Sequence, residues 1–285
     1  MEKVDIAFIG GSGLYKVPNL KNPKWIDIKC NFGFPSSKIC IGNLNGKSVA
    51  FLPRHGLDHN ISPSNINYRA NIEALKIIGV ENIISLSAVG SLRDDYNPGD
   101  FVVVDQFIDK TYARIKTFFD EDCVVHIPMS SPICKKLKEK VLIVLEKLKI
   151  NSHSSGTYIC IEGPQFSTLA ESNLYRSWGC DVIGMTNMPE AKLAKEAGIC
   201  YSAISMVTDF DCWHPKHDSV TIDQIIETLK KNSETAFCFI DEFCKQTKFV
   251  CDDETKNLSK NSIITDIPKI KKGTKKRLKN IIKDL

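Results

Sequence analysis

Short apolar runs alternate with amphipathic segments along this chain, and this alternation limits the fold more than any other feature. Runs typical of buried strands occupy residues 4–9, 82–87, 101–104, 157–160 and 199–207. Segments 132–148 and 189–197 have helical periodicity, and Gly198 follows the second as a helix-ending glycine would. The sequence therefore predicts an α/β fold, a single domain with a twisted mixed β-sheet flanked by helices.

Turn and capping residues predict further elements between these runs. Residues 25–52 are typical of antiparallel strands, with turns at 31–33 and 43–46. Ser62-Pro63 predicts the start of a helix that runs to about residue 78 and is closed by Gly79. Thr221-x-x-Gln224 is a capping-box pattern at the start of a further helix.

Composition favours a cytoplasmic protein. The 285 residues are 42% apolar, and the acidic N-terminal segment does not resemble a signal peptide. The longest uncharged runs span about twelve residues, too few for a membrane span. The eleven cysteines include no C-x-x-C pair, so we expect reduced thiols.

The positive charge is concentrated at the C-terminus. Residues 245–285 hold twelve basic and five acidic residues, a net +7 against +4 for the whole chain, so the remainder carries −3. We expect an α/β domain over 1–245 and a basic, partly helical and solvated tail over 246–285. Such a tail could bind nucleic acid or anionic lipid, but it contains a single aromatic residue and no recognition motif, so neither partner is expected.

Two carboxylates follow the apolar run at 199–207. Asp209 and Asp211 stand two residues apart, so on an extended segment both side chains face the same way. Ligands of open α/β sheets lie beyond the carboxyl ends of strands. The pair could bind a metal, act in acid–base chemistry or hydrogen-bond a nitrogen heterocycle, or it could be only a helix cap and a solvated acid.

Other strand ends carry groups suited to an anion. Gly10-Gly11-Ser12-Gly13 could direct backbone N–H groups at an anion or be a tight structural turn, and it matches neither the P-loop nor the dinucleotide fingerprint. Arg54 offers a planar fork that suits phosphate, and the adjacent His55 adds a donor. His59 lies four residues beyond His55, but Gly56 makes a helix there improbable, so we expect no metal site.

Three further segments also carry groups suited to a ligand. Ser87-Ala88-Val89-Gly90 allows close approach to the backbone but is not a nucleophile elbow. Met185-Thr186 precedes the helix at 189–197, whose N-terminal N–H groups favour an anion. Phe166, in Glu162-Gly-Pro-Gln-Phe-Ser167, could stack on a heterocycle or belong to the core. Together these strand ends predict a pocket for phosphate, a sugar and a nitrogen base.

With these residues in hand, the chain resembles the trimeric purine nucleoside phosphorylase family. The motifs that carry the resemblance are IAFIGGSGL, RHGLDHNISPSNINYRAN, SAVGSLRDDYNPGDFVVVDQFID, HIPMS, IEGPQFS, MTNMPEAKLAKEAGICY and TDFDCW. They cover residues 4 to about 230, in order, and do not extend into the tail. Within the family the chain is similar to the members that act on S-methyl-5′-thioadenosine.

The resemblance implies a role for each matching residue. Phosphate, the co-substrate, would be bound by Ser12, Arg54, His55, Ser87, Ala88 and Thr186. The nucleoside would be held by Phe166, Ser167, Met185, Asp209, Asp211 and Ile222, with His126 supplied by the neighbouring subunit of a homotrimer. Asp209 would be the catalytic acid, Ser167 and Ile222 would set specificity, and neither a metal nor a cofactor is implied.

The resemblance also implies a reaction mechanism, and it leaves alternative functions open. Adenine needs a proton at N7 to leave, while phosphate stabilises and attacks the cationic sugar carbon. Asp209 favours a 6-aminopurine, because the family has Asn there for 6-oxopurines. Gln165, where the family usually has Arg, removes a charge beside the base, whereas Ser12 and Ser87 keep the hydroxyl of the more frequent Thr. The alternatives are a phosphorylase of 6-oxopurine nucleosides or adenosine, and a non-catalytic purine sensor.

Overall fold

The computed structural model describes the chain except for residues 1–2, 12–16, 216–221, 246–248, 250 and 284. Its strands are β1 (Ile6–Gly10), β2 (Lys21–Ile26), β3 (Ile39–Leu44), β4 (Lys47–Pro53), β5 (Asn82–Ser91), β6 (Phe101–Val104), β7 (Gln106–Asp109), β8 (Ser152–His153), β9 (Thr157–Cys160), β10 (Val182–Gly184) and β11 (Cys200–Asp209). Its helices are α1 (Tyr68–Ile77), α2 (Lys135–Lys147), α3 (Leu169–Ser177), α4 (Asn187–Glu196), α5 (Ile222–Cys244), α6 (Asp253–Asn261) and α7 (Lys272–Leu278), with 3-10 turns η1 (Pro63–Asn65) and η2 (Ile267–Lys269).

The described strands form one mixed sheet, as the sequence predicts. Its main path runs β2-β3-β4-β1-β5-β10-β9-β7, and β11 joins β5 to β6, which in turn pairs with β8. The central strands β4, β1, β5 and β11 are parallel, whereas β2, β3 and β4 form antiparallel pairs. The carboxyl ends of the central parallel strands therefore meet at one edge of the sheet.

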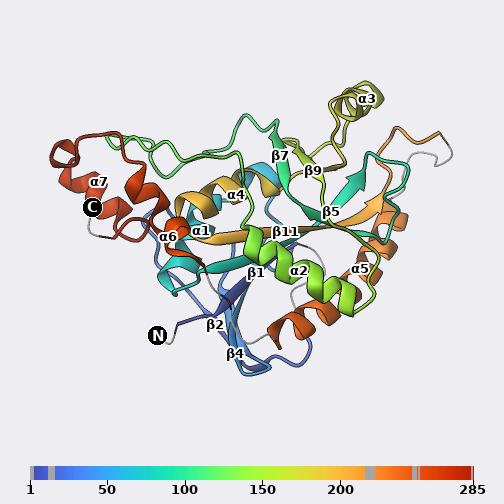
Figure 1. Ribbon diagram of the computed structural model, residues 1–285, viewed down its shortest axis with the longest axis horizontal. Helices are drawn as coiled ribbons and strands as arrows, with labels where there is room; N and C mark the ends of the chain where they lie inside the picture. Colours follow the sequence, from blue (N-terminus) through green and yellow to red (C-terminus); the bar gives the residue numbers. More distant parts are fainter. Residues whose placement is uncertain (1–2, 12–16, 216–221, 246–248, 250, 284) are drawn as a thin grey trace.

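Helices cover both faces of this sheet (Figure 1). Side chains of successive strand residues point to opposite faces. In β1, Ala7 and Ile9 join the core cluster under α1 and α4, whereas Ile6 and Phe8 join the cluster under α2 and α5. Because both faces are buried, β1, β5 and β11 are apolar along almost their whole length.

One predicted turn and one predicted helix end are confirmed, and one predicted helix start is wrong. The β3–β4 hairpin turns at Asn45 and Gly46, both with positive φ (51° and 79°), and Gly79 (φ 84°) follows α1. Ser62-Pro63 opens only the 3-10 turn η1, and Ser62 makes no side-chain cap. The helix begins at Tyr68 because the Asn67 side chain accepts from the Ala70 N–H.

Several elements carried weaker signals in the sequence. Helix α3 follows a capping box in which Thr168 and Glu171 bond each other's backbone, a pattern present in the sequence that the prediction overlooked. Strands β7, β8 and β10 have four residues or fewer. The capping-box residue Thr221 lies outside the described residues, and α5 follows it.

The basic tail is packed against the body, which corrects the expectation of a solvated appendage. It contains α6, η2 and α7, so its helical part is as expected. Ile270, Leu278, Ile281 and Ile282 are buried in the same core cluster as α1 and α4. In Figure 1 the tail (red) lies beside α1, at the opposite end of the molecule from α3.

Part of the tail's charge binds an acidic loop of the same chain. Arg277 donates to Glu121 Oε1 at 2.7 Å and to Asp120 Oδ1 at 2.8 Å. The Thr274 hydroxyl donates to Asp122 Oδ1 at 2.5 Å. The acidic stretch 120–122 therefore supplies an intramolecular partner for a segment that sequence composition alone had set apart.

Within the part of the chain that the structure describes, no helix is long and apolar enough to cross a membrane. All eleven cysteines are free.

Leu278→Ala should lower the free energy of unfolding by about 2–5 kcal/mol, because it removes a fully buried side chain of the tail. Lys276→Ala, at an exposed position of the same helix, should change that free energy by less than about 0.5 kcal/mol. Urea denaturation of both variants measures the difference. Equal, negligible effects would mean that the tail is solvated after all.

Candidate active site

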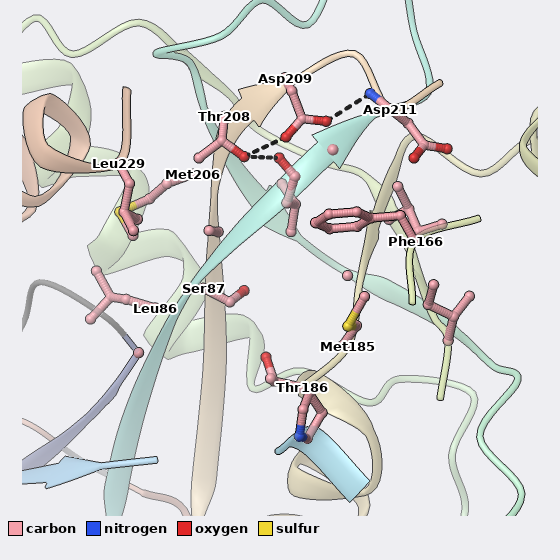
Figure 2. A pocket seen from close by; sticks show the side chains of 18 of the residues that line it. Leu86, Ser87, Phe166, Met185, Thr186, Met206, Thr208, Asp209, Asp211 and Leu229 are labelled. Carbon is pink, nitrogen blue, oxygen red and sulfur yellow. Dashed lines mark hydrogen bonds between the residues drawn. The ribbon is translucent and has the colours of Figure 1, made fainter. Parts of the chain in front are cut away.

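A cavity of about 270 Å³ opens at the carboxyl ends of the central strands. Ten of the residues selected from the sequence line it: Arg54, His55, Ser87, Ala88, Phe166, Ser167, Met185, Thr186, Asp209 and Asp211. Figure 2 shows Asp209 and Asp211 at one end, Ser87 and Thr186 at the other, and Phe166 and Met185 along one side. Leu86, Met206 and Leu229 form an apolar wall on the opposite side. Ser12 and the side chain of Ile222 lie outside the described residues.

Arg54 is turned into the protein, which corrects the expectation of a planar fork open to phosphate. Its Nε and Nη2 donate to the two carboxylate oxygens of Glu190 at 2.8 and 3.2 Å. Nη2 also donates to Ser85 Oγ at 2.6 Å, and Nη1 donates to Leu86 O at 3.2 Å. Four of the five N–H donors are thus used, and one on Nη1 is left for the cavity.

The Arg54–Glu190 ion pair is almost fully buried. The two side chains are 1% and 2% exposed. Burial opposes the charge on Arg54, but the attraction and hydrogen bonding of Glu190 raise the pKa of its guanidinium above the ordinary value. Glu190 also accepts from the hydroxyls of Ser85 and Tyr201 at 2.6 and 2.8 Å. This network joins β4, β5, β11 and α4 beneath the cavity.

The hydroxyl groups of the same end come from β5 and the loop before α4. Ser87 Oγ donates to Asn187 Oδ1 at 3.1 Å. Asn187 is held in turn by the Tyr201 hydroxyl, to which its Nδ2 donates at 2.7 Å. Thr186 caps α4 by position but makes no side-chain cap, so its hydroxyl is not committed to the helix.

His55 is fixed by a backbone carbonyl. Its Nδ1 lies 2.8 Å from Ile61 O. Burial and the neighbouring charge of Arg54 lower the pKa of His55 to about 4, with a smaller contribution from His59. The His55 and His59 rings are in contact, with centroids 4.4 Å apart and planes tilted by 31°. No group of three or more His, Cys, Asp or Glu residues suited to a metal occurs among the described residues.

The acid pair sits on an irregular end of β11. Between Val207 and Asp209 the register with β5 shifts, which places Asp209 beside Gly90. Asp209 Oδ1 accepts from the Asp211 N–H at 2.8 Å, an Asx-turn, so Asp209 has a local structural role as well. Burial raises the pKa of Asp209, although hydrogen bonds from Thr208 and the Asp211 N–H oppose the rise. Burial also raises the pKa of Asp211, and there the like charge of Asp209 adds to the rise.

Thr208 shows how Asp209 could hold a proton. The Thr208 hydroxyl lies 3.1 Å from Val89 O and 2.7 Å from Asp209 Oδ2. A hydroxyl has one hydrogen, and a carbonyl oxygen can only accept. If Asp209 is protonated, it donates to Thr208, which donates to Val89 O, and both contacts become hydrogen bonds.

The base-loop segment 162–168 carries an exposed ring and an unpaired hydroxyl. Phe166 is 68% exposed, so it is not a core residue. Ser167 Oγ is buried and has no hydrogen-bond partner among the described residues. A buried hydroxyl without a partner favours a ligand that supplies one.

Arg114 organises this loop, and no motif in the sequence would have revealed its role. Its guanidinium forms a buried ion pair with Glu162 at 3.1 Å. It also donates to the backbone oxygens of Glu162, Met185 and Met188 at 2.7, 2.6 and 2.6 Å. One side chain therefore ties the loop that carries Phe166 to the loop that carries Thr186.

His126 does not line the cavity of its own chain. It is exposed, which excludes a satisfied core histidine, and its backbone N–H donates to Ser262 O at 3.2 Å. Val125 pairs with Ile263 of the tail, so His126 stands on the segment that the tail supports.

The family follows from a direct comparison. A family model described as the phosphorylase superfamily matches residues 5–245. The chain belongs to the phosphorylase superfamily. A curated relative from Rhodospirillum rubrum, named S-methyl-5′-thioadenosine phosphorylase, is 54% identical over 231 residues, which are 81% of this chain and 79% of that protein.

Solved structures of the superfamily extend the likeness to the tail. A methylthioadenosine phosphorylase from an antarctic soil metagenomic library is 43% identical, with a TM-score of 0.92, over 99% of this chain and 100% of that chain. A methylthioadenosine phosphorylase from Schistosoma mansoni in complex with adenine is 33% identical, with a TM-score of 0.83, over 91% and 99% of the two chains. Because the first likeness covers almost the whole chain, the expectation that the resemblance ends before the tail is wrong.

Proposed function

We propose that this protein catalyses the reversible phosphorolysis of S-methyl-5′-thioadenosine to adenine and 5-methylthioribose 1-phosphate. The observation that carries the proposal is the layout of the cavity in Figure 2, with buried acids at one end and hydroxyl groups at the other. The acids suit a purine, and the hydroxyl groups, with His55 and the last N–H of Arg54, suit phosphate. The names of the similar proteins agree with a site for a purine nucleoside and phosphate.

The mechanism divides between the two ends. At one end, phosphate lies beneath the sugar, stabilises the positive charge that develops at C1′ and attacks that carbon. At the other end, Asp209 donates a proton to N7 of adenine as the glycosidic bond breaks. Phe166 and Ser167 contact the base, and Met185 lies against the ribose. Phosphate is the co-substrate in this scheme: it forms the new bond to C1′, while the proton from Asp209 allows adenine to leave.

The apolar wall favours a thioether over a hydroxyl at the 5′ position. The side chains of Leu86, Met206 and Leu229 offer no hydrogen-bond donor, and the only acceptor among them is the weak thioether sulfur of Met206. An apolar pocket rejects an added hydroxyl by only about 10²-fold, so adenosine would be a poorer substrate. A 6-oxopurine is disfavoured because its O6 would meet an acid pair in place of an amide donor.

Cleavage should require phosphate, and this experiment tests the proposed function. Adenine release from S-methyl-5′-thioadenosine should rise with phosphate concentration to saturation and yield a sugar phosphate, because phosphate is the nucleophile. The measurement is product analysis by chromatography in phosphate-containing and phosphate-free buffers. Release at the same rate in both buffers would identify a hydrolase and contradict the proposal.

Asp209→Asn should lower kcat/KM for S-methyl-5′-thioadenosine by about 10²–10⁴-fold, through loss of the general acid. Only the protonated carboxyl can donate, so wild-type activity should be present below the raised pKa of Asp209 and fall as pH rises through it. The variant should lack this decrease and use methylthioinosine relatively better.

The readout is the pH profile of kcat/KM for both nucleosides. Asp27→Asn, at a side chain 77% exposed, is the matched control and should behave as wild type. An unchanged ratio between the two nucleosides in Asp209→Asn would remove the basis for adenine selection by this residue.

We further propose a cytoplasmic homotrimer in which His126 completes the neighbour's cavity, with the reaction serving purine and methionine salvage. Its support is the exposed position of His126 and the family resemblance. Co-expressed Asp209→Asn and His126→Ala subunits should form mixed trimers that are more active than either variant alone, because an intact His126 then faces an intact Asp209. Activity no greater than the sum of the separate variants, or a fully active monomer in sedimentation, would refute the shared site.

A further inference from the structure

We propose that a second cavity, between the body of the protein and its C-terminal tail, binds a small molecule that carries two or more phosphate groups. This cavity has a volume of about 700 Å³, and its lining includes Lys3, just before β1, and Glu81, just before β5. It therefore lies at the amino ends of these parallel strands, whereas the candidate active site lies at their carboxyl ends. The second site is separate from the proposed phosphorolysis.

The walls of this cavity come from segments that are far apart in the sequence. The body supplies Lys3, the end of α1 with the loop that follows it (residues 76–81), and Glu196 of α4. The tail supplies residues of α6 between 256 and 260, and residues 280–283 near the end of the chain. Figure 1 shows the tail (red) beside α1. A ligand in this cavity would contact the body and the tail at once.

The lining of the cavity is strongly positive. Its ionisable side chains are Lys3, Lys76, Glu81, Glu196, Lys256, Lys260 and Lys283. Five positive and two negative charges give a net charge of +3 when both glutamates are ionised, and burial raises the pKa of Glu196 to about 7. Lys3 and Lys256 share one partner, because both bond the Glu81 carboxylate, at 2.6 and 3.0 Å. Among the described residues, the other three lysines have no ion-pair partner.

Lys76 gives the strongest reason to expect an anion. It is half-buried in the last turn of α1. Burial lowers the pKa of Lys76, and the charges of Lys283 and Lys256 lower it further, whereas Cys251 and Glu81 oppose the decrease. A cation that is partly removed from water without a counter-ion costs free energy of folding. The helix dipole offsets part of that cost, and a bound anion would also relieve the repulsion among the lysines.

The size and composition of the cavity favour a phosphorylated small molecule. Its volume of about 700 Å³ falls in the range of about 300–1,000 Å³ that small-molecule pockets have, and one phosphate would leave most of it empty. Lysine binds phosphate oxygens as a point charge, and unpaired lysines from α1, α6 and the chain end suit more than one phosphate group. Ile77, which is 39% exposed, adds apolar surface for the rest of the ligand.

Isothermal titration calorimetry of the full-length protein with tripolyphosphate tests the site. Lys76→Met keeps most of the apolar stem but removes the charge, so it should raise the Kd for tripolyphosphate about tenfold or more. The matched control is Lys231→Met, which removes an exposed lysine paired with Glu227 on α5, and its Kd should equal that of wild type. The KM for phosphate should be unchanged in both variants, because neither lysine lines the active-site cavity.

Thermal unfolding gives a second readout that separates a binding lysine from a structural one. Without tripolyphosphate, Lys76→Met should be at least as stable as wild type, because it removes a half-buried charge that has no counter-ion. Tripolyphosphate should raise the Tm of wild type and of Lys231→Met, but not that of Lys76→Met. A lysine with only a structural role would lower the Tm when replaced and leave the response to tripolyphosphate intact.

Two results would overturn the inference. One is the absence of tripolyphosphate binding to the wild-type protein. The other is binding that Lys76→Met leaves unchanged and that excess orthophosphate abolishes, which would place tripolyphosphate in the active site. Neither result would affect phosphate-dependent release of adenine, so the second site and the proposed function can fail separately.

Discussion

The buried ion pair between Arg54 and Glu190 is the interaction on which the rest of the site depends. It brings the end of β4 against α4, and its hydrogen bonds to Ser85 and Tyr201 join β5 and β11 to the same point. Breaking such a pair typically costs about 3–5 kcal/mol, because it leaves an uncompensated buried charge. Three strands, β4, β5 and β11, and helix α4 are therefore held in one arrangement beneath the cavity.

This arrangement gives the two ends of the cavity opposite electrostatic characters. At the phosphate end Glu190 neutralises the charge of Arg54, so an anion there is stabilised mainly by directed hydrogen-bond donors. At the base end, burial favours a protonated Asp209, which suits proton donation to a purine. Arg114 then connects the loops that carry Phe166 and Thr186, so that the two ends keep their separation.

The fold was predictable because apolar runs and turn residues report local structure. The same alternation located the strand ends, and with them ten residues of the cavity. The expectations that failed concerned residues whose interaction partners are distant in sequence. The fork of Arg54 faces a carboxylate 136 residues away, and the tail's Arg277 binds an acidic loop about as far away. Arg114 has no local pattern at all, because its role is defined by backbone oxygens of separate loops.

The phosphate KM of Glu190→Gln, measured beside its free energy of unfolding, tests the role of the ion pair most directly. The substitution keeps the shape of the side chain but removes the charge that orients Arg54. The variant should lose about 3–5 kcal/mol of stability, and its KM for phosphate should rise about tenfold or more, with the KM for S-methyl-5′-thioadenosine changed much less. Unchanged stability together with an unchanged KM for phosphate would contradict this account.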